Sequence, residues 1–292
     1  MIKRTFYKDR PAIQVANDEF SALFLPFDGA KLVSFKDNEG YEFLAQADNK
    51  EYRRLFLDTD YEKSECSGFD DMFPTIDPCE INGQKYLDHG EVCRRGHSVA
   101  IEKETAIFSC DLPDLNVCYE KTVYCLDDAL FIKYTIQNNN DFEFPYIWAA
   151  HAMFKGEEGA YAFSNFHPDT EKIFLSGNPD KSSPHILPPR ESGIKHYKYY
   201  YNEENSPLIC GMVYPKCGRK ITMKFNNDIV KYLGFWVNPG DLNGMYNLAV
   251  EPCTAPFDSP VKAEKVNAAS YIKAKGKIEF ILKLSYKKLS EL

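Results

Sequence analysis

The stretch LNVCYEKTVYCLDDALFIKYTIQ, residues 115–137, decides the fold class because apolar and polar side chains alternate through both of its halves. A period of two is typical of β-strands that bury one face, and the Asp127-Asp128 pair between the halves is a turn signal. The stretch therefore predicts a β-hairpin. The apolar residues that share a face are Leu115, Val117, Tyr119, Val123 and Cys125 in the first half, and Leu130, Ile132, Tyr134 and Ile136 in the second.

The same alternation recurs along most of the chain, whereas helical periodicity is almost absent. One short helix is expected over 259–267, with Ser259 as its cap and Pro260 in its first turn. The pattern predicts an all-β fold of the sandwich type, built as a single domain over 1–292. Further strands are expected at 12–16, 20–25, 30–36, 98–110, 142–151, 208–214, 219–225, 231–237, 245–251 and 277–286. Two stretches, 45–97 and 155–206, are poor in strand signals and are expected to be long loops, of the kind that often cover a site.

Charge and composition exclude several classes of function. The formal net charge is −8 and no basic cluster stands out, which disfavours nucleic acid and anionic membranes as partners. No apolar run approaches the roughly 18 residues of a membrane span, and the N-terminal stretch has no signal-peptide core, so a soluble cytoplasmic protein is expected. The nine cysteines are scattered, odd in number and without a CxxC pair, which predicts reduced core thiols.

Two ionisable residues lie on otherwise apolar strands. His151 ends the strand in PYIWAAHAMF, and Glu251 ends the strand in YNLAVEP. Each follows an alanine by two positions, Ala149 and Ala249, so a small neighbour on the same face leaves a hollow above the sheet. A satisfied core histidine and a structural ion pair are the plain alternatives. A hollow that holds one imidazole and one carboxylate is nonetheless what proton transfer requires.

A loop rich in acidic residues and turns, 68–92, is the third candidate region. Within it His89 precedes Gly90, which lets the backbone approach a ligand closely. The alternative is a solvated acidic loop. A metal site is disfavoured because no tight ligand spacing such as HxH or HExxH occurs, and no cofactor-binding motif is present either.

Six stretches in order resemble the aldose 1-epimerases of the galactose mutarotase-like superfamily, which include the hexose-6-phosphate 1-epimerases. The resemblance covers roughly residues 12–286 and implies a large antiparallel β-sandwich with a sugar cleft and no cofactor. The stretches are DGAKLVSFKDNEGYEFL (28–44), DDMFPTIDP (70–78), DHGEV (88–92), WAAHAMF (148–154), LGFWVNPGD (233–241) and NLAVEPCTAPFD (247–258).

The resemblance also implies roles for individual residues. His151 falls at the family's general acid and Glu251 at its general base, while His89 falls on a histidine that holds the sugar near its ring oxygen. Asp71 and Trp236 match cleft residues. The family's sugar-binding arginine has no aligned counterpart, and Arg94, just beyond the DHGEV motif, is the nearest candidate; the family's cleft aspartate between the two catalytic strands has no clear match.

Three functions follow as alternatives, each with a small sugar as partner. The first is a mutarotase that interconverts the α and β anomers of an aldohexose by acid–base ring opening. The second is a hexose-6-phosphate 1-epimerase, which needs a cationic cluster that Arg94 and Arg95 could begin. The third is a sugar-binding or sensing protein without catalysis. A lyase or hydrolase fits less well, because hydrolysis usually needs two carboxylates flanking the bond.

Overall fold

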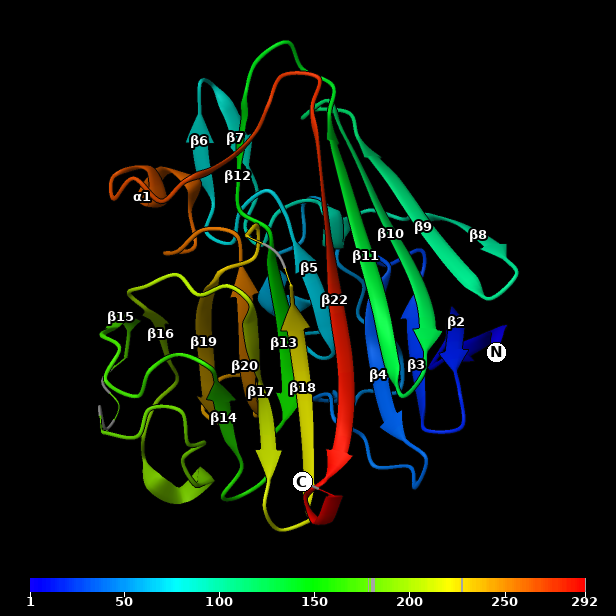
Figure 1. Cartoon of the computed structure of the whole chain (residues 1–292), viewed down its shortest axis with the longest axis vertical. Coiled ribbons are helices and arrows are strands. Elements are labelled where there is room, and N and C mark those ends of the chain that lie inside the picture. The colour runs from blue at the N-terminus through cyan, green and yellow to red at the C-terminus, as the bar shows by residue number, and fades with distance from the viewer. Residues whose placement is uncertain (178, 180–181, 227, 292) are drawn as a thin grey trace.

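The alternating stretch at 115–137 forms the hairpin that its pattern predicts. Strand β10 (Val117–Leu126) pairs antiparallel with β11 (Ala129–Asn138) through ten successive residue pairs, around the turn at 127–128. The computed structural model describes residues 1–177, 179, 182–226 and 228–291. Figure 1 shows this hairpin in the front layer of the molecule, beside the long C-terminal strand β22 (Lys277–Lys288).

Two large antiparallel sheets pack face to face and confirm the predicted β-sandwich (Figure 1). The ten-stranded sheet has the order β1 (Ile2–Tyr7), β2 (Arg10–Ala16), β3 (Phe20–Leu25), β4 (Lys31–Asp37), β5 (Phe69–Met72), β13 (Ala149–Lys155), β20 (Tyr246–Cys253), β19 (Tyr232–Pro239), β16 (Tyr197–Tyr201), β15 (Lys172–Ser176). The eight-stranded sheet has the order β14 (Tyr161–Ser164), β17 (Leu208–Tyr214), β18 (Arg219–Phe225), β22, β11, β10, β9 (Thr105–Leu112), β8 (Ser98–Glu102).

Smaller elements lie at the edges of the sandwich. Two short sheets pair β12 (Phe144–Tyr146) with β21 (Ser270–Ile272) and β6 (Cys79–Ile81) with β7 (Gln84–Tyr86). The expected helix is shorter than predicted: α1 covers Pro260–Glu264, with Ser259 at its N-cap. Single 3₁₀ turns occur at Tyr61–Lys63, Val92–Arg94, Arg190–Ser192 and Leu289–Glu291. Among the described residues, every helix is too short or too polar to cross a bilayer.

The structure corrects three expectations about strands. The stretches 45–97 and 155–206 are not loops throughout, because they contribute β5, β15 and β16 to the ten-stranded sheet, β14 to the other large sheet, and the β6–β7 pair. The first strand, β1, was not expected at all. Strand β20 continues through Pro252 to Cys253, since Leu233 and Tyr232 of β19 pair with these two residues.

A large aromatic core separates the two sheets. Trp148, directly before β13, is fully buried and packs edge-on against Tyr134 of β11 and Phe280 of β22. Its indole Nε1 donates a 2.8 Å hydrogen bond to the hydroxyl of Tyr119, so the polar edge of the ring is satisfied inside the core. This packing fixes β13 from its inner face, which leaves its outer face to present other side chains.

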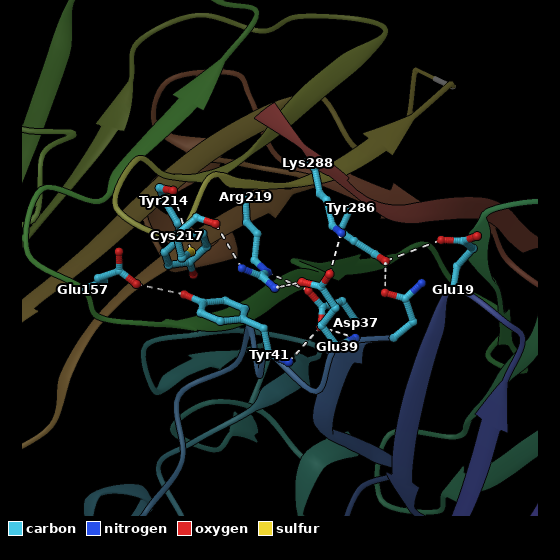
Figure 2. A network of polar contacts seen from close by, with 11 residues as sticks. Glu19, Asp37, Glu39, Tyr41, Glu157, Tyr214, Cys217, Arg219, Tyr286 and Lys288 are labelled. Atoms are coloured by element: carbon cyan, nitrogen blue, oxygen red, sulfur yellow. Dashed lines mark hydrogen bonds and ion pairs between the residues drawn. The ribbon is translucent and has the colours of Figure 1, made fainter. Parts of the chain in front are cut away.

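A network of charged and aromatic side chains joins the two sheets at one end of the sandwich (Figure 2). Arg219 of β18 donates 2.6 Å hydrogen bonds to Asp37 at the end of β4 and to Glu39 in the turn that follows. Its guanidinium also lies over the ring of Tyr41, 4.7 Å from the ring centre. Lys288 of β22 adds a 2.6 Å bond to Glu39. The network therefore links β4 of one sheet to β18 and β22 of the other.

Replacing Arg219 by glutamine is expected to lower the free energy of unfolding by about 2 kcal/mol, because the buried Asp37 carboxylate then loses its charged partner. Urea unfolding followed by circular dichroism measures this change. Lys216→Gln is the matched control, since Lys216 and Glu158 form a pair in which both side chains are exposed and water and salt screen such a pair almost completely. Equal losses in the two variants would contradict the role given to the network.

Candidate active site

His151 and Glu251 lie side by side on the outer face of the ten-stranded sheet. Ala152 of β13 pairs with Val250 of β20, and both residues pack into the core between the sheets. Because side chains alternate along a strand, the neighbouring His151 and Glu251 point to the opposite face. On the other side of Glu251, the register places Gly234 of β19 directly opposite it.

The two side chains are in direct contact. His151 Nδ1 forms a short hydrogen bond with Glu251 Oε1, although the two residues are a hundred positions apart in the sequence. Glu251 is fully buried, whereas His151 keeps a small exposed fraction of 6%. The structure thus brings together the acid and the base that the resemblance implies, in a position that a small molecule can reach.

A buried lysine that was not predicted completes this cluster. Lys198 of β16 places its Nζ 2.9 Å from Glu251 Oε2 and 2.8 Å from Asp258 Oδ1. The hydroxyl of Tyr200 donates a 2.5 Å hydrogen bond to the same oxygen of Asp258. Gly234 makes room for this arrangement, since a Cβ there would lie 2.7 Å from the phenol ring of Tyr200. Lys198 therefore bridges two buried carboxylates.

The charges of this cluster fix the protonation state of Glu251. Burial alone would raise the pKa of its carboxyl, but Lys198 and His151 outweigh burial and lower the pKa to about 2. Burial would likewise lower the pKa of Lys198, yet Asp258 and Glu251 raise it above its ordinary value. Glu251 is consequently a carboxylate at neutral pH, and as an acceptor it receives the hydrogen bond from Nδ1 of His151.

His89 enters the same region from the loop after β7. Its ring stacks on Tyr61 with the ring centres 3.7 Å apart, and lies 5.8 Å from the ring of His151. Burial lowers the pKa of His89, an effect that Asp88, 2.9 Å from Nδ1, only partly offsets. The neutral imidazole can both donate and accept a hydrogen bond. Glycine is required at position 90, where a Cβ would lie 2.2 Å from the carbonyl oxygen of Phe73.

These residues line one cavity of about 340 Å³. His89, His151, Glu251 and Trp236 all contribute to its wall, as does Lys198. This size falls within the range of small-molecule sites in proteins, which begins at about 300 Å³. Four of the six residues predicted for the sugar cleft are therefore found together.

Asp71, by contrast, does not line the cavity. It accepts hydrogen bonds from Lys121 Nζ (2.7 Å) and the hydroxyl of Tyr134 (3.0 Å), both of which belong to the opposite sheet. Its neighbour Asp70 faces the other way and accepts from Tyr61, which lies in the cavity wall. The expectation for Asp71 is wrong because adjacent residues of β5 point to opposite faces of the sheet.

Arg94 also lies outside the cavity. Its guanidinium is buried and donates to the backbone carbonyls of Phe56, Thr59, Asp88 and Gly90. With all these donors directed at backbone oxygens, Arg94 holds the loop that carries His89 and is not placed to bind a substrate anion. The expected contact of Arg94 with the sugar is corrected accordingly.

Solved structures with the same architecture identify the fold as that of the galactose mutarotase-like proteins. A proposed aldose 1-epimerase from Klebsiella pneumoniae subsp. pneumoniae MGH 78578 has a TM-score of 0.79 and 14% identity, covering 99% of this chain and 84% of that one. The Slr1438 protein of Synechocystis sp. PCC 6803 has a TM-score of 0.73 and 14% identity, covering 99% and 100%. A galactose mutarotase-like protein from Clostridium acetobutylicum has a TM-score of 0.66 and 16% identity, covering 99% and 98%.

Sequence comparison adds no closer relationship. The chain matches no family model, and it has no significant match among curated proteins. At 14–16% identity the structural likeness establishes the fold, and the activity has to be argued from the side chains of the site.

Proposed function

We propose that this protein is an aldose 1-epimerase that interconverts the α and β anomers of a neutral sugar. The observation that carries the proposal is the buried contact between Glu251 and His151 in the wall of an open cavity. A lysine holds the glutamate ionised, and the imidazole beside it donates a hydrogen bond to the carboxylate. A ready base and a ready acid at one point are what anomer exchange needs.

The reaction opens and recloses the sugar ring. Glu251 takes the proton of the C1 hydroxyl while the bond between C1 and the ring oxygen breaks, and His151 gives a proton to that oxygen. The open aldehyde turns about its C1–C2 bond and closes on the other face, with the two residues in reversed roles. Atoms and charges balance over the cycle without a cofactor. His89 lies beside His151, and in this proposal it contacts the sugar near its ring oxygen.

Substrate binding would also adjust the strength of the base. In the structure His151 is one of the two groups that lower the pKa of Glu251. A sugar whose C1 hydroxyl takes the place of His151 as the partner of Oε1 removes part of this effect. The pKa of Glu251 then rises towards the value at which a general base works best, while Lys198 keeps the carboxylate in position.

The cavity suits a neutral sugar better than a sugar phosphate. Four carboxylates line it, Glu62, Asp77, Glu251 and Asp258, against the lysines Lys198 and Lys262. Both lysines are already paired, Lys198 with Glu251 and Asp258, and Lys262 with Asp77. A phosphate group would meet repulsion and no unpaired cation among the described residues of the wall.

Anomer exchange measured across a panel of free aldoses and their 6-phosphates tests the proposal. We expect the protein to accelerate mutarotation of at least one free aldose, and to act on the matching 6-phosphate at least tenfold less well. A preference for the phosphate would favour the hexose-6-phosphate 1-epimerase instead. Measurable sugar binding without any turnover would favour the non-catalytic sugar-binding protein.

A further inference from the structure

The cavity contains a buried acceptor that none of the catalytic steps uses. Asn247 lies on β20 four residues before Glu251, so the two side chains point to the same face of the sheet. Its exposed fraction is 2%, it lines the cavity, and its Oδ1 has no hydrogen-bond donor among the described residues. Its amide nitrogen instead faces the sulfur of Met153, at 3.8 Å. A buried carbonyl of this kind is normally satisfied by a donor, which a water or a ligand in the cavity can supply.

The distance along the strand sets the size of that ligand. Four residues of β-strand separate Glu251 from Asn247, which corresponds to about 13 Å at about 3.3 Å per residue. This separation exceeds the width of one pyranose ring and matches two linked rings. A monosaccharide positioned for ring opening at Glu251 leaves the Asn247 end of the cavity empty.

The surface between the two ends is suited to a second sugar ring. Ala249 forms a small floor between Glu251 and Asn247, and the register places Trp236 of β19 and Met153 of β13 on its two sides. The indole of Trp236 is braced by His196, whose ring centre lies 5.0 Å away and whose Nδ1 is 2.9 Å from Asp241. A fixed aromatic wall beside a small floor is a surface on which a sugar ring can stack.

The far end of the cavity is held rigidly. Asn238, opposite Asn247 in the register, accepts hydrogen bonds from the backbone nitrogens of Gly240 and Leu242 and donates to the carbonyl of Leu242. These bonds fix the turn after β19, whose residue Leu242 lines the cavity. Asn238 is therefore occupied by the turn, whereas the Oδ1 of Asn247 is available to a ligand.

We propose that the substrate is a neutral reducing disaccharide rather than a single hexose. Its reducing ring lies between Glu251 and His151, and its second ring lies over Ala249 beside Trp236, with one hydroxyl donating to Asn247 Oδ1. The excess of carboxylates in the wall excludes a phosphate as the extra group. This inference rests on the proposed function for its reaction, but the binding of the second ring can be tested without turnover.

Binding is the first test, and it is measured in the Glu251→Gln protein, in which turnover should be strongly slowed. Calorimetry should show cellobiose or maltose binding about tenfold more tightly than glucose, the gain expected from one satisfied acceptor and a stacked ring. In the Glu251→Gln/Asn247→Leu protein this preference should disappear. Equal affinity for glucose and both disaccharides would overturn the inference, whatever the catalytic activity.

The second test measures the kinetics of single variants that keep Glu251. Asn247→Leu should lower kcat/KM for disaccharide mutarotation about tenfold and change that for glucose less than twofold. Asn202→Leu, at an exposed asparagine outside the cavity, is the matched control and should change neither. Equal losses on both sugars would overturn the inference while leaving the proposed activity intact, whereas turnover of no aldose at all would overturn the proposed function.

Discussion

Glu251→Gln and His151→Asn are each expected to lower the rate of anomer exchange at least about a hundredfold, because each removes one proton-transfer group and such groups contribute about 10²–10⁴-fold. Glutamine keeps the shape of Glu251 and can still accept from Lys198, but it cannot take a proton from a sugar hydroxyl. Asparagine at position 151 keeps a polar group and cannot supply the proton. Polarimetry on a freshly dissolved α-anomer measures both variants.

Two substitutions of the same chemical type serve as controls. Glu279→Gln changes a half-exposed glutamate paired with Lys133, and His167→Asn changes an exposed histidine. Neither residue lies in the cavity, so both variants should retain the activity of the unchanged protein. Thermal unfolding should show that the Glu251 and His151 variants are folded. If the Glu251→Gln and His151→Asn proteins both react within threefold of the rate of the unchanged protein, Glu251 and His151 have no part in the mechanism.

Replacing Lys198 by methionine is expected to lower the free energy of unfolding by about 3–5 kcal/mol, because the variant leaves two buried carboxylates without their cation. Glu251 has no exposed surface and Asp258 very little. The pKa of Glu251 should rise once its strongest opposing charge is absent. Catalysis should fall at pH values below the raised pKa, because a protonated Glu251 cannot act as a base. Urea unfolding and the pH profile of kcat measure the two effects.

The pH dependence separates this electrostatic role from simple packing. Glu251 has a folded pKa of about 2 against an ordinary value of 4.5, so its stabilising effect is complete above the ordinary value and is lost as pH falls through about 2. The stability difference between the unchanged protein and Lys198→Met should therefore shrink as the pH falls from 5 towards 3. The double variant Lys198→Met/Glu251→Gln should recover part of the loss. A pH-independent difference would indicate packing alone.

Several strands whose burial alternates could be predicted from the sequence, whereas two strands buried at every position, β5 and β16, could not. The hairpin predicted at 115–137 forms around its predicted turn at 127–128. Strand β16, YKYYY, is buried at all five positions, so it has no polar face to alternate with. Strand β5, FDDM, is also wholly buried. In the sequence its two aspartates suggest a solvated loop, because their partners Lys31 and Lys121 lie far from them along the chain.

Contacts between residues that are distant in the sequence also explain which residues of the candidate site could not be predicted. His151 and Glu251 stand out as ionisable residues on apolar strands with a small neighbour, and this local signal made them candidates, to which the resemblance then gave roles. Lys198 carried a weaker signal, a lone cation within a run of tyrosines, and its meaning depends on Asp258 sixty residues away. His97 illustrates the opposite case: it lies in a polar stretch of the sequence, RRGHS, yet it is buried, and burial lowers its pKa to about 3.

Polarimetry of freshly dissolved α-anomers, with the unchanged protein and the Glu251→Gln variant at equal concentration, is the decisive experiment for the role of Glu251 in anomer exchange. Glucose, maltose and cellobiose should be included, so that sugars with one ring and sugars with two rings are both measured. The account predicts that the unchanged protein shortens the approach to anomeric equilibrium of at least one of these sugars, and that the variant leaves it close to the rate in buffer. An unchanged protein that alters none of these rates, or a variant as fast as the unchanged protein, would contradict it.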